Sequence, residues 1–260
     1  MNLIVSLSAG LLSWGFADRI EAANSFLYGT FVFFGTFSVY NLQRVVKIAQ
    51  ANMFTPWLLW VKRNRAIIIT LSVISGVGAL TSLWLLHLNN IISITVLSFA
   101  VACSLLYVVR INGINLRGIP FLKIHVISIT WTLLVVIFPE VSGGSIQGVI
   151  YVFLAHYFYI LSVTIPFDIR DLKYDNTIYK TIPQILGVNR AKWLAVLFLL
   201  FYTALIQLVF PLLLFSPWFW LGVFFTGCLI IAVNERVSDW YCAGLIDGSI
   251  GLLGLVYLLA

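Results

Sequence analysis

The chain has 260 residues, of which 62% are hydrophobic and only 9% are charged, and its mean hydropathy is +1.05. Soluble domains carry about 25% charged residues, so this composition excludes an ordinary soluble protein and predicts an integral membrane protein. The formal net charge is +6. The cations are concentrated in the loops on one side of the membrane, and this explains the positive charge better than a nucleic-acid partner does. We therefore expect no such partner.

Apolar runs predict nine transmembrane helices, since a span needs about 20 mostly apolar residues. Their expected bounds are 3–17, 25–46, 66–88, 91–109, 121–138, 147–167, 191–215, 217–233 and 243–260. The first run is the least apolar, but it lacks the basic start and the cleavage site of a signal peptide, so we expect it to be retained. No long soluble insertion separates the runs, and we therefore predict a single all-α domain over residues 1–260.

The positions of Lys and Arg predict the orientation. With an inside N-terminus, the inner loops and the helix ends beside them hold every Lys and Arg except Arg19. Cytoplasmic loops carry this bias. We therefore expect a cytoplasmic N-terminus and an outer C-terminus, with the bacterial inner (plasma) membrane as the location.

An inner segment at 54–63 combines Trp57 and Trp60 with Lys62 and Arg63. This pattern is typical of a short helix that lies at the membrane interface. A simple loop with anchoring side chains explains the same pattern equally well.

Two cationic clusters lie on the inner side. Asn41, Arg44 and Lys47 are spaced three apart at the end of the second run and can share a helical face. The second cluster spans residues 107–123 and includes Arg117 and Lys123. Such donors suit an anionic ligand, because Arg and Lys are the usual partners of phosphate. The alternative for both clusters is charge that only sets the topology.

The segment after the sixth run contains three of the nine acidic residues, Asp168, Asp171 and Asp175, together with two cations. On a helix these carboxylates lie within about 60° of one another, so they can face one cavity. Acidic residues contribute little to membrane orientation, and topology alone does not require them. Mg²⁺ is commonly held by one or two carboxylates and substrate phosphates. The segment therefore predicts a site for divalent cations against a diphosphate.

Other polar residues within the spans are less informative. Asp247 lies inside the last run and either holds a structural hydrogen bond or lines a cavity. His125 and His156 are lone residues within spans and are best interpreted as packed polar groups. A transporter is disfavoured, because charge in the middle of the membrane is scarce apart from Asp247.

The acidic segment and the residues after it resemble a known motif. The pattern Asp168-x-Arg170-Asp171-x-x-x-Asp175, followed by the run from Lys180 to Pro183 and by Leu186-Gly187, is similar to the second aspartate-rich motif of the UbiA superfamily of intramembrane prenyltransferases. Tyr107 and Lys123 resemble the Tyr and Lys of that family on the loop between the fourth and fifth helices.

The resemblance implies a nine-helix bundle around a cavity that opens to the cytoplasm and laterally to lipid. It further implies an enzyme that binds an isoprenoid diphosphate through Mg²⁺, ionises it and attaches the prenyl group to an aromatic or other hydrophobic acceptor. Mg²⁺ would bind to Asp168, Asp171 and Asp175. The expected diphosphate contacts are Asn41, Arg44, Lys47, Tyr107, Arg117, Lys123, Arg170 and Lys180. Tyr107, Trp131, Tyr157 and Tyr159 could line the cavity and stabilise a carbocation, or they could only pack.

The first aspartate-rich motif of the family is degenerate in this chain. Its Asn is Asn41, but its three aspartate positions fall on Leu42, Val45 and Ala49. In one interpretation Arg44 and Lys47 replace the missing metal ion, and the second motif alone holds a single Mg²⁺. In the other, the fold persists without the chemistry, and the protein binds a prenyl lipid or serves as a membrane scaffold subunit.

Overall fold

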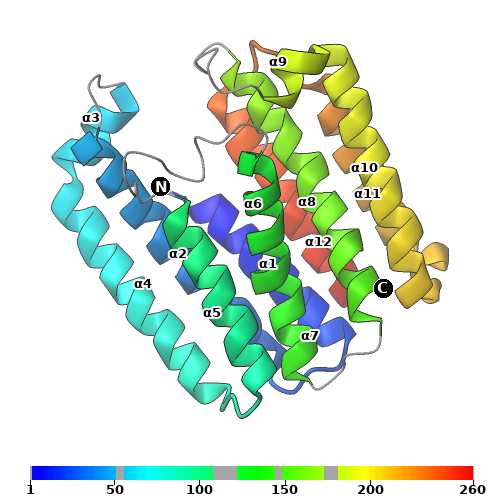
Figure 1. Cartoon of the computed structure of the whole chain (residues 1–260), viewed down its shortest axis with the longest axis horizontal. Coiled ribbons are helices and arrows are strands. Elements are labelled where there is room, and N and C mark those ends of the chain that lie inside the picture. Colours follow the sequence, from blue (N-terminus) through cyan, green and yellow to red (C-terminus); the bar gives the residue numbers. More distant parts are fainter. Residues whose placement is uncertain (1, 51–55, 108–121, 144–147, 173–180, 260) are drawn as a thin grey trace.

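A computed structural model describes the chain except residues 1, 51–55, 108–121, 144–147, 173–180 and 260 (Figure 1). The described residues form helices and connecting turns, with no strand among them. The longer helices are α1 (Leu3–Arg19), α2 (Ser25–Gln50), α4 (Arg65–Leu85), α5 (Ile91–Leu106), α6 (Leu122–Thr132), α8 (Val149–Asp171), α10 (Val188–Val209), α11 (Pro217–Ala232) and α12 (Asp247–Leu259). The shorter ones are α3 (Pro56–Arg63), η2 (Leu133–Ile137), α7 (Phe138–Ser142), α9 (Ile182–Leu186), η3 (Pro211–Phe215) and η4 (Tyr241–Ile246).

Several of these segments are suited to a membrane. Within the described part of the chain, five segments are long and apolar enough to cross a bilayer, and two shorter apolar helices accompany them. The five are Arg65–Leu85, Leu122–Ser142, Val149–Asp171, Val188–Val209 and Tyr241–Leu259. The predicted all-helical membrane fold is confirmed at this level, whereas the number of nine spans stays a prediction.

The observed bounds differ from several of the predicted runs, and three of the differences change the path of a helix. The run 191–215 is divided, because α10 ends at Val209 and Pro211 starts a separate 3₁₀ turn. The run 121–138 continues to Ser142 through the π-helical segment η2. The run 147–167 continues as helix to Asp171, so that two of the predicted aspartates lie on its last turn.

The segment predicted as either an interfacial helix or a loop is helical at α3, and Lys62 and Arg63 form its last turn. Its position at a membrane surface remains a prediction. In Figure 1 α3 lies at the end of the bundle that also carries the N-terminus, α9 and the last turn of α8. The C-terminus and α7 lie toward the opposite end.

Glycines allow α1 to pack closely against both α2 and α12. A Cβ atom built on Gly10 would lie 2.9 Å from the carbonyl oxygen of Gly29, and one built on Gly254 would meet the backbone of Leu11. Small residues at such crossings let helix backbones approach, which is the usual basis of helix packing in membranes. The small residues of the first run are therefore explained by close packing of α1 against two neighbouring helices.

Candidate functional site

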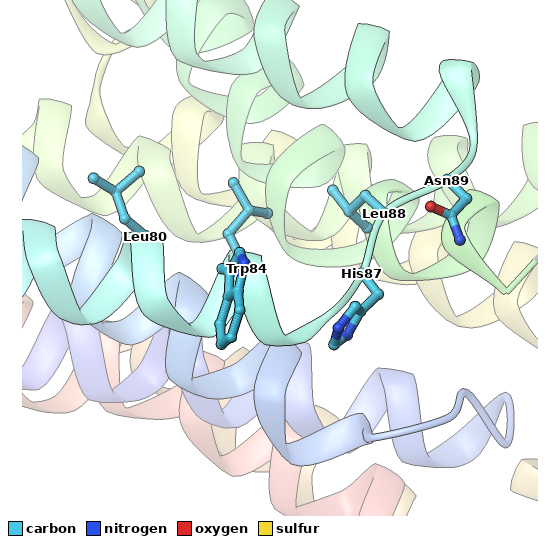
Figure 2. Close-up of a pocket in the computed structure, with 6 residues that line it drawn as sticks. Leu80, Trp84, His87, Leu88 and Asn89 are labelled. Carbon is cyan, nitrogen blue, oxygen red and sulfur yellow. The ribbon is translucent and has the colours of Figure 1, made fainter.

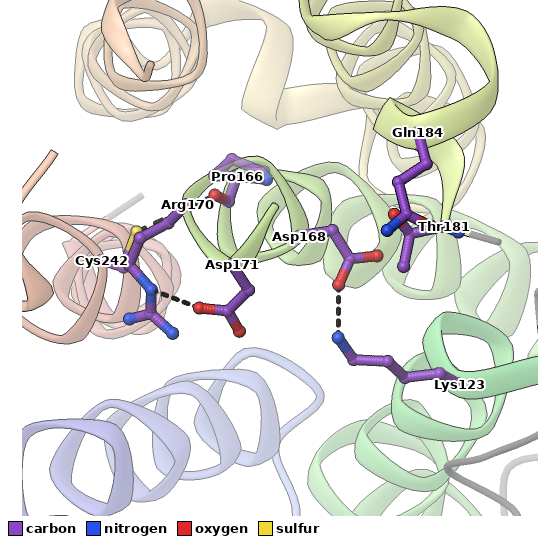
Figure 3. A network of polar contacts seen from close by, with 8 residues as sticks. All are labelled: Lys123, Pro166, Asp168, Arg170, Asp171, Thr181, Gln184 and Cys242. Atoms are coloured by element: carbon purple, nitrogen blue, oxygen red, sulfur yellow. Dashed lines mark hydrogen bonds and ion pairs between the residues drawn. The ribbon is translucent and has the colours of Figure 1, made fainter. Parts of the chain in front are cut away.

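A buried ion pair connects α6 and α8 at the end of the bundle that carries the N-terminus. Lys123 Nζ lies 2.5 Å from Asp168 Oδ1, and the side chains are 17% and 1% exposed, respectively (Figure 3). A buried carboxylate is costly unless it is paired and hydrogen bonded. Lys123 therefore supplies the countercharge for the first aspartate of the predicted motif.

A second ion pair lies on the same turn of α8. Arg170 Nε donates to Asp171 Oδ1 at 2.8 Å (Figure 3). Arg170 Nη1 lies 3.5 Å from the exposed Asp239. The guanidinium group also lies over the Phe167 ring, 5.3 Å from its centroid. We call Lys123, Asp168, Arg170 and Asp171 the charged end. Each of its two carboxylates is already neutralised by a cation of the same chain.

The degenerate first motif forms a polar connection between α1 and α2. The buried Asn41 donates from Nδ2 to the Phe37 carbonyl at 2.8 Å, and its Oδ1 accepts from Asn2 Nδ2 at 3.4 Å. Arg44 Nη2 donates to Asn2 Oδ1 at 3.5 Å. The amide of Asn41 is thus used within the protein, where the sequence predicted a diphosphate contact. Asn2 belonged to no predicted cluster.

A third group of polar residues lies in the interior of the bundle. Trp131 Nε1 on α6 donates to the hydroxyl of Tyr40 on α2 at 3.0 Å. This hydroxyl is within electrostatic range of Arg44, of Tyr107 at the end of α5 and of Asp247 at the start of α12. The Trp131–Tyr40 hydrogen bond therefore connects α6 with α2. The sequence left open whether Trp131 and Tyr107 line a cavity or only pack, and it gave Tyr40 no role.

The remaining aromatic candidates differ in their surroundings. Tyr157 is half-buried, and its hydroxyl lies 2.6 Å from His125 Nδ1. Tyr159 is 1% exposed and donates to the Ser249 carbonyl at 2.9 Å, which favours packing over a cavity wall. His156 is fully buried and hydrogen bonded, as expected for a packed polar group.

Several predicted site residues lie outside the described part. Asp175, Arg117 and Lys180 belong to the undescribed ranges, and the side chain of Lys47 is likewise not described. Among the described residues, no group of three or more His, Cys, Asp or Glu side chains could hold a metal ion. The described part of the motif thus supplies two carboxylates, Asp168 and Asp171.

A hollow lies away from the charged end, near the turn between α4 and α5. It has a volume of about 420 Å³, is open and is largely apolar (Figure 2). Its lining consists of Leu80, Leu83, Trp84, His87, Leu88 and Asn89. It contains neither a carboxylate nor a cluster of cations, so it offers no site for the predicted diphosphate chemistry.

Comparisons with known proteins connect the chain to one fold. No protein-family model and no curated protein sequence matches it. Among solved structures, a digeranylgeranylglyceryl phosphate synthase matches with a TM-score of 0.59 and 17% identity, over 99% of this chain and 93% of that chain. A UbiA homologue from Archaeoglobus fulgidus bound to GPP and Mg²⁺ matches with a TM-score of 0.59 and 13% identity, over 100% and 99% of the two chains.

A structure of a UbiA homologue from Archaeoglobus fulgidus bound to DMAPP and Mg²⁺ gives a TM-score of 0.55 at 13% identity. These matches extend over nearly the full length of both proteins. At such low identity they show the fold rather than the activity. The chain has the UbiA fold, as the second aspartate-rich motif predicted.

Proposed function

We propose that this protein, with its UbiA fold, is a membrane prenyltransferase. It transfers a prenyl group from an isoprenoid diphosphate to a hydrophobic acceptor. The observation that carries this proposal is the charged end, where a buried Asp168–Lys123 pair and the Arg170–Asp171 pair meet at one end of a helical bundle. Charged groups placed there without function would cost stability.

The two ion pairs are suited to exchange partners with an incoming diphosphate. Lys123 and Arg170 each retain 17% of their side-chain exposure. Both are cations that bind phosphate oxygens through charge-assisted hydrogen bonds. Arg44 on α2 is proposed as a third cation. Tyr107 and the undescribed Lys47, Arg117 and Lys180 complete the proposed diphosphate contacts.

The donor set fits an Mg²⁺ ion that enters with the substrate. Such an ion commonly takes one or two protein carboxylates and fills its other positions with water and phosphate oxygens. Asp168 and Asp171 provide two carboxylates on one turn of α8, and Asp175 is the proposed third. When bound, Mg²⁺ supplies Lewis-acid neutralisation of the leaving diphosphate.

The protein's own side chains bind the diphosphate and stabilise the charges of the proposed reaction. Lys123 and Arg170 bind the diphosphate and stabilise the charge that develops as it leaves, because preformed cations need no reorganisation at that moment. The rings of Tyr107, Trp131 and Tyr157 are half-buried. In this proposal they line the cavity and attract the allylic cation through their faces. The interior of the bundle limits the access of water to that cation.

The proposal also includes the membrane arrangement. We infer nine spans, a cytoplasmic N-terminus and an outer C-terminus, with the charged end facing the cytoplasm. The bias of Lys and Arg toward this side supports that orientation. The bacterial inner membrane is the proposed location.

A second function is favoured by one specific observation. The first motif has lost its aspartates, and the described carboxylates of the second are each paired with a cation. A protein with these features could bind a prenyl lipid, or act as a membrane scaffold subunit, without ionising a diphosphate. Fold alone does not separate the two functions.

The decisive experiment is single-turnover release of pyrophosphate from radiolabelled geranyl, farnesyl and geranylgeranyl diphosphates. Purified protein in lipid is assayed with Mg²⁺ and with a chelator, beside Asp171→Asn. Glu235→Gln, an exposed carboxylate after α11, is the matched control. We expect Mg²⁺-dependent release that Asp171→Asn lowers about 100-fold or more, because losing a metal ligand removes several kcal/mol of stabilisation.

Each outcome separates the two functions. Release that persists in Glu235→Gln and is lost in Asp171→Asn supports the transferase. Retention of the diphosphates without release, for every chain length, supports the binding or scaffold function and overturns the enzyme.

A further inference from the structure

A patch of exposed cations lies where α3 joins α4, at an edge of the bundle (Figure 1). Arg63 ends α3, Arg65 begins α4 and Lys62 precedes them, and all three side chains are exposed. Exposed cations at a helix end can serve topology alone. Three features distinguish this patch from such charge: the lack of nearby acidic residues, the apolar side chains beside it and the fixed geometry of the junction.

The patch lies in a long part of the chain that has no acidic residue. Residues 22–139 contain eight Lys and Arg and neither Asp nor Glu. The next acidic residue along the chain, Glu140, belongs to α7, which lies toward the opposite end of the bundle (Figure 1). Within the described part of the chain, Arg63 and Arg65 form no ion pair. Their positive charge is therefore directed outward, where it attracts an anionic partner.

Apolar side chains lie on both sides of the cations along the chain. Leu59 and Trp60 on α3 are 43% and 42% exposed. Apolar side chains that are more than half exposed recur along one face of α4, at Ile67, Ile74, Val77, Leu80 and Trp84. Since α4 is long and apolar enough to cross a bilayer, this face suits lipid chains, and the cations before it suit the level of the headgroups. A phospholipid offers both an anionic group and apolar chains, which a soluble acidic protein does not.

Hydrogen bonds fix the backbone that carries the cations. Asn64, between the two helices, donates to the Trp60 carbonyl from its backbone N–H at 3.1 Å and from its side-chain Nδ2 at 2.9 Å. Its own carbonyl accepts from the Ile68 N–H at 3.0 Å. Val61, which is 1% exposed, anchors α3 in the protein. The backbone of Arg63 and Arg65 is therefore already ordered, which lowers the entropic cost of binding a ligand.

We propose that Arg63 and Arg65, together with Lys62, bind the headgroup phosphate of an anionic phospholipid in the leaflet at this end of the protein. Guanidinium groups bind phosphate oxygens through charge-assisted hydrogen bonds. Trp60 and Leu59 contact the same lipid at the boundary between headgroup and acyl chain. The inference uses the predicted membrane position of α3 but not prenyl transfer, so it applies to a transferase and to a prenyl-lipid-binding protein alike.

The test measures lipid binding by the purified full chain in detergent. Native mass spectrometry during titration gives the Kd of phosphatidylglycerol and of phosphatidylcholine with the same acyl chains, and the wild type should prefer phosphatidylglycerol. Because each cation near an anionic headgroup contributes about fivefold, the double variant Arg63→Gln with Arg65→Gln should weaken phosphatidylglycerol binding about 25-fold. Its binding of phosphatidylcholine should be unchanged. The matched control, Arg190→Gln with Arg236→Gln, removes the same charge from two other exposed positions and should keep the preference.

A second titration, with geranyl diphosphate, separates a lipid headgroup from a prenyl diphosphate as the bound anion. Wild type and the Arg63/Arg65 variant should bind geranyl diphosphate equally, and without lipid they should unfold at the same temperature, since the replaced side chains are exposed.

Four results would overturn the inference. They are equal binding of the two phospholipids by the wild type, a preference that persists in the Arg63/Arg65 variant, an equal loss in the Arg190/Arg236 control, and a variant that loses geranyl diphosphate binding instead of lipid binding. Absence of geranyl diphosphate binding in the wild type would refute the proposed function and leave the lipid site standing.

Discussion

Two polar clusters in the bundle differ in whether all their polar groups are buried and hydrogen bonded to one another. The first is the charged end, whose cations and Asp171 keep part of their side-chain surface exposed. The second, which we call the histidine network, consists of His156, Tyr202 and Tyr257, and all three are at most 2% exposed.

The histidine network is closed. His156 Nδ1 lies 2.9 Å from the Val152 carbonyl, which can only accept, so the proton resides on Nδ1. His156 Nε2 then accepts from Tyr257 at 2.9 Å, and Tyr202 donates to Tyr257 at 3.0 Å. Fully satisfied networks make an interior rigid and specific. The comparison teaches that burial of polar groups alone does not indicate a site, whereas groups that can still exchange partners do.

The largest loss of folding stability is expected from breaking the buried ion pair of the charged end. Lys123→Met removes the cation that pairs with Asp168, which is 1% exposed. Removing one partner of a buried ion pair costs about 3–5 kcal/mol. Thermal unfolding in lipid should show this loss. The double variant Lys123→Met with Asp168→Asn should recover most of it, and a single variant as stable as the wild type would contradict the assignment.

The next effect tests packing near the histidine network. Gly254→Ala places a methyl group against the backbone of Leu11 on α1. Overpacking costs about 1–3 kcal/mol, and we expect the upper end here because a backbone cannot move aside as a side chain can. Gly248→Ala on the same helix is the control, since a Cβ atom there has no neighbour within 4 Å. Release of pyrophosphate per folded molecule should be unchanged in both variants.

A smaller loss is expected inside the histidine network. Tyr257→Phe removes the donor to His156 Nε2 and the acceptor for Tyr202. Leaving buried polar groups unsatisfied costs about 1–3 kcal/mol. Tyr151→Phe, at a hydroxyl on an exposed ring, provides the control for the change of residue type. If Tyr257→Phe abolished release while stability was kept, the network would belong to the site and the comparison would fail.

The sequence predicted the fold because its signals are local. Apolar runs and the positions of Lys and Arg require only counting along the chain. The predicted run ended at residue 167, but the spacing of Asp168 and Asp171 already allowed both carboxylates to share a helical face, as they do on the last turn of α8. The family resemblance then supplied the bundle, which the solved structures confirm as a fold.

The partners of the site residues could not be predicted, because they depend on packing between distant helices. Lys123 was expected to bind an anionic ligand, but its ion pair with Asp168 joins residues 45 positions apart. Asn41 was expected at a diphosphate, which stays a prediction, and its hydrogen bonds to Phe37 and Asn2 had no sequence signal. The π segment before Asp247 has no sequence signal of its own, so the alternatives for that residue stayed open.

The smallest effect on stability and binding is expected at Asp239, at the exposed edge of the charged end. Asp239 is 89% exposed and lies 3.5 Å from Arg170. Because exposed pairs contribute about 0–1 kcal/mol, Asp239→Asn should leave the unfolding temperature nearly unchanged. It removes a negative charge near a proposed diphosphate contact, so binding of geranyl diphosphate should tighten about fivefold or less, which corresponds to the same 1 kcal/mol. Titration at increasing salt checks this, since screening should remove the difference. A large or salt-independent change would mean that Asp239 acts as a buried partner of Arg170, which would contradict its assignment to the exposed edge.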